Sequence, residues 1–190
     1  MSGKSRIPKS ISKVNSRLTL HHGRVFKLVR ENVTLPNDVT IDLDIIRHPG
    51  ASAMVPLAEN SCIILVKQYR HATGDFIWEI PAGTLNPGET SLECAKRELT
   101  EETGFSAAEW QKLGEITPEP GYSDERIHIF LAAELSSANQ QLDKDEVLNV
   151  HELNLADAIE MIYAGVIQDG KTIAGLLLAN HWLKEKRKAE

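Results

Sequence analysis

The feature that most constrains this chain is the stretch at residues 83–105, GTLNPGETSLECAKRELTEETGF, which is rich in glutamate and glycine. Thr90 followed three residues later by Glu93 is the signature of a capping box, and Gly104 is typical of a helix end. The stretch therefore predicts a loop followed by a helix of about 13 residues.

Like charges are crowded on this predicted helix. Three apolar positions share one narrow face, which indicates packing against a core: Leu92, Ala95 and Leu99. Glu98, Glu101 and Glu102 lie on the flank of that face at spacings where carboxylates repel. Two interpretations remain open on spacing alone, a solvated acidic face or a site for a divalent cation with oxygen ligands.

Alternating and apolar runs predict strands on both sides of this helix. VTIDLDII at 39–46 alternates apolar and polar residues, and with the turn LPND before it the segment 25–47 reads as a hairpin. CIILVKQYR at 62–70 is apolar almost throughout, as in a central strand. Helices are expected at 155–163 and 171–186, so the order of elements indicates an α+β fold, either mixed or layered as α/β/α.

Charge divides the chain into an N-terminal start and a body. Residues 1–30 hold eight Lys and Arg and no acid, whereas the remainder holds 13 basic and 27 acidic residues. We expect residues 1–16 to be a flexible, solvated tail, with a transit peptide or an anion-binding arm as alternatives. Residues 17–190 are expected to form one domain, because a chain of this length fits a single core.

Composition also excludes several classes of protein. No apolar run approaches the roughly 18 residues of a membrane span, and the start lacks a signal-peptide core, so we expect a cytoplasmic protein. The acidic body does not suit nonspecific nucleic-acid binding. Cys62 and Cys94 form no metal-type pair and are expected to be buried free thiols.

The surroundings of the glutamates carry a more specific signal. The pattern G-x5-E-x7-R-E-L-x-E-E-x-G-F is met in full by Gly83, Glu89, Arg97, Glu98, Leu99, Glu101, Glu102, Gly104 and Phe105. This is the Nudix box, and on it the chain strongly resembles the Nudix hydrolases. The resemblance implies the Nudix fold, an α/β/α sandwich with a mixed sheet, here with an N-terminal antiparallel hairpin as a subdomain.

Motifs outside the box narrow the resemblance. RHPGASAMVPL, VKQYRHATGDFIWEIPAG and PEPGYSDERI look like the ADP-ribose and ADP-sugar pyrophosphatase branch. Pro120 stands 15 residues after Phe105, where a proline marks members of the ADP-ribose type. The resemblance covers about residues 25–185.

The family implies roles for the residues of the box. Glu98 and Glu102 would be the main ligands of Mg²⁺, for which Mn²⁺ substitutes, and Glu101 a further or water-mediated ligand. The main-chain carbonyl of Ala82 would complete the metal site. Arg97 would orient the carboxylates through a salt bridge, and Glu89 would support the loop or a second shell of the metal.

In this branch the base that activates water tends to be a glutamate on a loop after the box. The segment QLDKDEVLNV offers Asp143, Asp145 and Glu146, of which Glu146 is our choice and Asp145 the reserve, with Glu101 as a different possibility. Three residues are expected to contact substrate: Arg70 at a phosphate oxygen, Glu79 at ribose or base, and Glu125 at substrate or metal.

The reaction implied is Mg²⁺-dependent hydrolysis of ADP-ribose or a related ADP-sugar to AMP and a sugar phosphate. The alternatives are another nucleotide sugar, such as GDP-mannose, and a sensor of the Nudix fold that binds ADP-ribose without cleaving it. The resemblance also implies a homodimer in which residues 17–48 exchange strands between subunits. A monomer that keeps this hairpin on its own sheet is the alternative.

Overall fold

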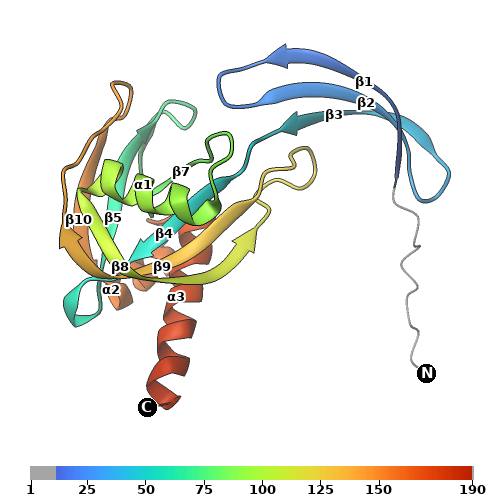
Figure 1. The fold of residues 1–190 in the computed structure, drawn as a ribbon. Coiled ribbons are helices and arrows are strands. Elements are labelled where there is room, and N and C mark those ends of the chain that lie inside the picture. The colour runs from blue at the N-terminus through green and yellow to red at the C-terminus, as the bar shows by residue number, and fades with distance from the viewer. Residues whose placement is uncertain (1–11, 190) are drawn as a thin grey trace, which may run out of the picture. The chain divides into compact units, whose positions relative to one another are not determined.

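A computed structural model describes residues 12–189 (Figure 1). These residues form two compact units, which are described separately. One unit comprises the chain up to His48 together with Glu119–Glu125, and the other comprises Pro49–Pro118 and the chain from Arg126 onward.

The first unit is a three-stranded antiparallel sheet in the order β1-β2-β3. Its strands are β1 Lys13–His22, β2 Lys27–Thr34 and β3 Thr40–Arg47. The central strand carries Glu31, only 1 % exposed, which accepts hydrogen bonds from Arg17 of β1 at 2.5 Å and Arg47 of β3 at 2.7 Å. Cross-strand ion pairs and the buried Val29 and Val33 therefore hold this sheet together.

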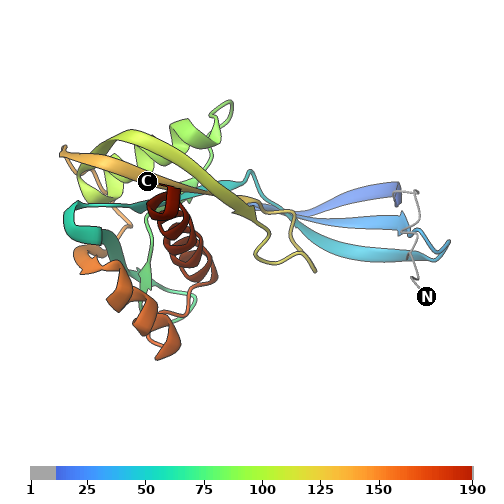
Figure 2. The same ribbon diagram turned by 90° about the horizontal axis from the view of Figure 1, so that it is seen from below.

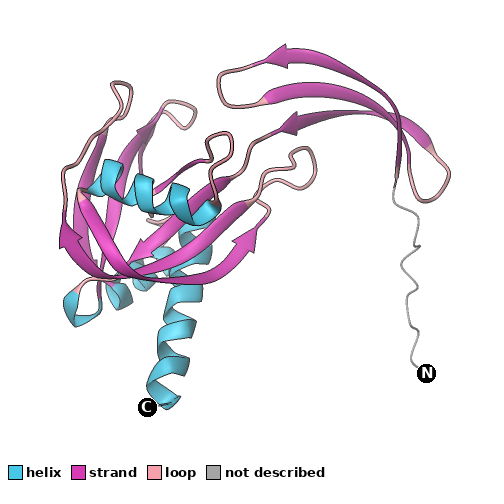
Figure 3. Ribbon diagram, viewed as in Figure 1, coloured by secondary structure: helices cyan, strands magenta, loops and turns pink. Residues whose placement is uncertain are grey.

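The expected hairpin is confirmed by β2 and β3, which pair from Thr34↔Thr40 to Lys27↔Arg47. The expectation of a flexible tail is wrong at residues 13–16, which begin β1 and pair with β2; their polar character hid this strand in the sequence. Residues 1–11 of the expected tail lie outside the described residues. Figure 3 shows the strands of this unit in magenta.

The second unit contains two sheets. One is a four-stranded mixed sheet in the order β7-β4-β9-β8, in which β4 and β9 are parallel, and the other is an antiparallel sheet in the order β10-β5-β6. The strands are β4 Ala51–Pro56, β5 Cys62–Arg70, β6 Asp75–Glu79, β7 Ala82–Thr84, β8 Phe105–Ile116, β9 Ile127–Ser137 and β10 Leu148–Asn154. The apolar β5 is the centre of its sheet, as its sequence predicts.

Helices cover the sheets from two sides, which gives the expected α/β/α sandwich. They are α1 Ser91–Thr103, α2 Leu155–Tyr163 and α3 Gly170–Ala189. Alternate residues of β4 face opposite ways: Met54 packs with Ala95 and Leu99 of α1, whereas Val55 packs with Leu176 of α3. Figure 2 shows α1 and α3 on opposite sides of β4 and β9.

A close approach fixes α3 on its sheet. A Cβ at Gly175 would lie 2.7 Å from Ile80 Cδ1 and 3.4 Å from Val55 Cγ2, so a larger residue here would displace Ile80 or move the helix outward. Within residues 12–189, no helix combines the length and the apolar character that crossing a bilayer requires.

Candidate functional site

The helix that carries the acidic residues is positioned at both ends. The Thr90 hydroxyl accepts from Glu93 N and the Glu93 carboxylate accepts from Thr90 N, so the predicted capping box is present. Gly104 ends the helix in the left-handed conformation, with φ 71°. At the start of α1 the buried Ser52 hydroxyl of β4 donates to Ser91 O at 2.7 Å, which ties α1 to the mixed sheet.

Packing of α1 draws two carboxylates inward. Ala95 and Leu99 are fully buried, and Glu98 and Glu102 on the neighbouring flank are only 8 % and 2 % exposed. Glu98 lies so close to the preceding loop that a Cβ on Gly83 would be 1.8 Å from its Oε1. Any residue larger than glycine at position 83 would therefore displace the Glu98 carboxylate from this place.

Burial makes this flank electrostatically unfavourable. Loss of hydration, together with the neighbouring Glu98 charge, raises the pKa of Glu102 to about 8. A single hydrogen bond, from Ala82 N at 3.0 Å, opposes this effect directly. Burial also raises the pKa of Glu98, although Arg97 acts in the opposite direction.

Arg97 links the loop to the acidic residues, as the family resemblance implies. Its Nε and Nη2 donate to the two Glu89 oxygens at 2.8 and 2.9 Å, and its Nη1 donates to Glu98 at 2.5 Å and to Glu101 at 3.0 Å. The hydrogen bond from Arg97 lowers the pKa of Glu89 to about 2. Glu89 also accepts from Asn86 N at 2.8 Å, so it holds the loop closed against α1.

The donor set fits a hard divalent cation. In the described part of the chain no three acidic, imidazole or thiol side chains converge as a metal site, and Arg97 engages both Glu98 and Glu101. The groups on this flank are nevertheless all oxygen donors, which Mg²⁺ and Mn²⁺ take. A buried Glu102 with a raised pKa and no cationic partner at hydrogen-bond distance is a group that a cation would stabilise.

The loop with the candidate base is anchored on α1. Gln140 Nε2 donates to Glu102 O at 2.6 Å, and Gln141 N donates to Glu101 O at 3.0 Å. Further along, Glu146 closes a turn by accepting from Asp143 N at 2.9 Å. The Glu146 charge contributes to the raised pKa of Glu98 and Glu102, after burial and closer charges, so the structure brings it into the neighbourhood of the acidic flank.

Arg70 and Glu79, both expected to contact substrate, are bound to each other. Arg70 Nε and Nη2 donate to the two oxygens of Glu79 at 2.7 and 2.8 Å, and Lys171 Nζ also donates to Glu79 Oε2. With Glu79 only 1 % exposed, both of its oxygens are engaged. Burial by itself raises the pKa of Glu79, but Arg70 and Lys171 outweigh it and the net pKa is lowered.

Sequence reasoning missed Lys171, Asp169 and Thr172, which continue this cluster from the start of α3. It also missed Gln68, a polar residue inside the apolar run of β5. Gln68 is 5 % exposed and shares a strand face with Arg70, and its side chain makes no hydrogen bond to another described residue.

Glu125, the third expected substrate contact, belongs to the first unit. Its Oε1 lies 3.6 Å from His48 Nδ1, and the neighbouring Asp124 accepts from Arg47 and from His48 N at 2.9 Å each. The segment 119–125 is thus attached to the end of β3.

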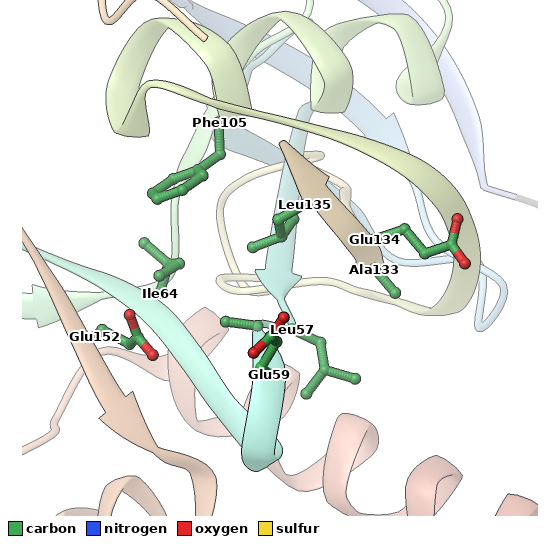
Figure 4. A pocket seen from close by; sticks show the side chains of 9 residues that line it. Leu57, Glu59, Ile64, Phe105, Ala133, Glu134, Leu135 and Glu152 are labelled. Carbon is green, nitrogen blue, oxygen red and sulfur yellow. The ribbon is translucent and has the colours of Figure 1, made fainter. Parts of the chain in front are cut away.

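A pocket elsewhere in the second unit is separate in composition from these residues. It has a volume of about 390 Å³, and the apolar side chains of Ile64, Phe105 and Leu135 line it together with Glu59 and Glu152 (Figure 4). None of the candidate site residues lines this pocket.

Comparison with known proteins agrees with the sequence motifs. The model of the NUDIX domain matches residues 46–176. The ADP-ribose pyrophosphatase of Bacillus subtilis is 41 % identical over 152 residues, which cover 79 % of this chain and 82 % of that protein. The GDP-mannose pyrophosphatase of Escherichia coli is 34 % identical over 180 residues, covering 82 % and 91 % of the two chains.

A solved structure described as an ADP compounds hydrolase has the same fold. It superposes with a TM-score of 0.81 at 23 % identity and covers 93 % of this chain and 96 % of its own. The expected fold class is therefore confirmed.

Proposed function

This chain belongs to the Nudix family, and on that premise we propose that it hydrolyses the pyrophosphate bond of ADP-ribose or a related ADP-sugar, giving AMP and a sugar phosphate. The observation that carries the proposal is the pair of buried carboxylates, Glu98 and Glu102, within a complete Nudix box beside a loop glutamate. The relationship to the Bacillus subtilis ADP-ribose pyrophosphatase supports the substrate class.

The cofactor in this proposal is Mg²⁺, with Mn²⁺ as a substitute. Glu98, Glu101, Glu102 and the carbonyl of Ala82 would hold it, because they supply only oxygen ligands and two of them are nearly buried. When bound, the metal supplies neutralisation of the pyrophosphate charge and a lowered pKa for an attacking water.

The chain's own groups then divide the work. Glu146 takes the proton of the attacking water, since the start of its loop is hydrogen-bonded to the main-chain carbonyls of Glu101 and Glu102. Arg70 binds a phosphate oxygen, because its Nη1 makes no hydrogen bond to another described residue and its side chain is 41 % exposed. Arg97 holds Glu98 and Glu101 in place through its hydrogen bonds.

Two of the expected substrate contacts stand differently in this proposal. Glu79 acts through Arg70 rather than on ribose or base, because both of its oxygens are engaged. Glu125 remains a proposed substrate contact on sequence grounds alone.

GDP-mannose is the second candidate substrate, favoured by the 34 % identity to the Escherichia coli GDP-mannose pyrophosphatase. A sensor that binds without cleaving is disfavoured, because every glutamate of the box is present.

We further propose that the protein acts in the cytoplasm as a homodimer through the first unit. The strands of its sheet expose several apolar side chains, among them Leu18 at 61 %, Val14 at 45 % and Leu20 at 42 % on β1, and such a sheet is suited to pairing with another copy. Light scattering on the purified chain tests this, and a monomer at all concentrations would contradict it.

The activity is tested with a substrate panel. ADP-ribose, ADP-glucose, GDP-mannose, diadenosine polyphosphates and NADH are incubated with Mg²⁺ or Mn²⁺, and the products are separated by chromatography. We expect AMP and ribose 5-phosphate from ADP-ribose at the highest kcat/KM. Release of GMP and mannose 1-phosphate as the fastest reaction would transfer the proposal to GDP-mannose, and an inert panel would overturn it.

A further inference from the structure

Lys171 stands at a position that the start of a helix does not favour by itself. It lies in the first turn of α3, where the helix dipole is unfavourable to a cation by about 0.3–1 kcal/mol. Two anions compensate for it: Glu79, whose Oε2 accepts from Lys171 Nζ, and Asp169, whose Oδ2 lies 3.0 Å from the same nitrogen. Lys171 is only 13 % exposed, so it serves these partners rather than the solvent.

Asp169 fixes the lysine from the helix side. Its Oδ2 also accepts from Thr172 N at 2.9 Å and from the Thr172 hydroxyl at 2.5 Å, which caps the start of α3. The Thr172 oxygen in turn accepts from Ile80 N at 2.8 Å, next to Glu79 in sequence. The start of α3 is thus hydrogen-bonded to the segment that carries Glu79.

Gly175 brings this part of α3 close to the sheet. It lies one turn after Lys171, and its missing side chain allows the contact with Ile80. Lys171 and Thr172 therefore reach Glu79 and Ile80 from a segment 92 residues away. We call Arg70, Glu79, Asp169, Lys171 and Thr172 the Glu79 network.

The Glu79 network sets which nitrogens of the Arg70 guanidinium are hydrogen-bonded within the protein. Glu79 binds Arg70 through Nε and Nη2, which leaves Nη1 without a partner among the described residues. Glu79 lies three residues before Ala82, whose N donates to Glu102 Oε2 at 3.0 Å, so one short segment joins the partner of Arg70 to the acidic flank of α1. Lys171 also donates to Glu79, so the negative charge of Glu79 is balanced by two cations and not by Arg70 alone.

We propose that Lys171 is a positioning residue for the diphosphate of the substrate: by sharing Glu79, it leaves Arg70 Nη1 and its positive field directed at a phosphate oxygen. This inference rests on the proposed hydrolysis of a nucleoside diphosphate sugar. It assigns a role in substrate binding to the start of α3, outside the box and its flanking motifs.

The first test replaces the lysine and separates KM from kcat. Lys171→Met removes the charge and keeps an unbranched apolar side chain, and Lys171→Arg restores the charge. Lys184→Met on the exposed side of α3 is the matched control. For ADP-ribose with Mg²⁺ we expect Lys171→Met to raise KM about 5- to 20-fold, within the range of coupling inside one hydrogen-bond network.

The same test also predicts the effect on kcat and the rescue by a second cation at position 171. We expect kcat to change less than about threefold, because the acidic residues of α1 and Glu146 are untouched, and Lys171→Arg to restore most of the KM. Lys171→Gln serves the same comparison if the methionine variant does not fold. A folded Lys171→Met or Lys171→Gln protein with the KM of the control would overturn the proposal.

The second test asks whether Lys171 acts through Arg70. In an Arg70→Met background, Lys171→Met should raise KM by less than about twofold, because the group that it positions is gone. An effect as large as in the parent would mean that Lys171 acts independently of Arg70, and the proposal would be wrong.

Binding distinguishes this inference from the proposed function. ADP-ribose is titrated by calorimetry in a Glu146→Gln background with Mg²⁺, and Lys171→Met should raise Kd by about the same factor as KM. If the wild-type protein cleaves no nucleotide of the panel and the Glu146→Gln protein binds none, the proposed function fails. If the Glu146→Gln protein binds ADP-ribose and the added Lys171→Met leaves Kd unchanged, only the positioning role fails.

Discussion

Glu79 and Glu102 are equally buried, at 1 % and 2 % exposure, but their surroundings are opposite. Glu79 receives hydrogen bonds from two cations, Arg70 and Lys171, and its pKa is lowered despite its burial. Glu102 receives one main-chain hydrogen bond and lies near the charge of Glu98, and its pKa is raised to about 8.

The difference separates a buried anion whose counter-charges the protein supplies from one that lacks them. In the Glu79 network the protein supplies the counter-charges itself, and the carboxylate is stable as folded. On the acidic flank of α1 the protein leaves Glu102 without a cationic partner at hydrogen-bond distance, so positive charge from a ligand would stabilise its ionised form. We therefore expect substitutions in the two regions to have opposite consequences for activity and stability.

The largest expected effect is on turnover. Glu98→Gln removes charge from a proposed metal ligand and should lower kcat for ADP-ribose at least about 10²-fold, as for other preorganised sites. The fold should persist, because the amide occupies the same space beside Gly83. Steady-state kinetics and circular dichroism check this, with the exposed Glu160→Gln as the control. Turnover like that of the control would remove the acidic flank from the chemistry.

The base comes next. Glu146→Gln should lower kcat about 10²-fold, the lower end of what general bases contribute, and leave Mg²⁺-dependent binding of ADP-ribose intact. The same kinetics and a calorimetric titration measure the two effects, with Asp145→Asn compared in parallel. If Asp145→Asn alone impairs turnover, the base is Asp145.

The next prediction concerns the stability that the ion-paired Glu79 provides. Glu79→Gln leaves Arg70 and Lys171 beside a neutral amide and should destabilise the protein by about 3–5 kcal/mol at pH 7. The lowered pKa of Glu79 means that this stabilisation is present above its ordinary value of 4.5 and is lost as pH falls through the folded-state value. Urea unfolding at pH 7 and in acid measures this, and equal stability of variant and parent at pH 7 would contradict the comparison.

The smallest effect has the opposite sign. Glu102→Gln should stabilise the metal-free protein at pH 9, because it removes a buried negative charge. The raised pKa means that the parent loses stability as pH rises from 4.5 through about 8, so the gain should vanish near pH 4. We expect a rise in Tm of about 2–4 °C, the shift that 1 kcal/mol produces at this chain size, measured by calorimetry with EDTA. A lower Tm for the variant at pH 9 would mean that Glu102 is structurally satisfied without metal.

Local patterns in the sequence were enough to predict much of the second unit. The capping box of Thr90 and Glu93 and the apolar face of α1 depend on residues a few positions apart, and the structure has both. The burial of Glu98 and Glu102 follows from the same face, since they lie on its flank.

Long-range contacts were out of reach of the sequence. Lys171 and Glu79 meet across 92 residues, and no periodicity within either segment indicates the partner of the other. A lysine two residues after Asp169 at a predicted helix start was a weak local signal, because that position disfavours cations. β1 was missed for a similar reason: its ten residues are all exposed, so no buried face marks the strand.

The attachment of the loop after β9 to α1 has a mechanical consequence. Gln140 and Gln141 tie the loop to the carbonyls of Glu102 and Glu101, and Val147 O accepts from Tyr69 N at the other end. Only residues 142–146 lie between these hydrogen-bonded positions, so the segment is too short to move far from the helix. Glu146 thus moves only within a small volume next to α1, and inserting residues into this segment would enlarge that volume without changing where its ends are attached.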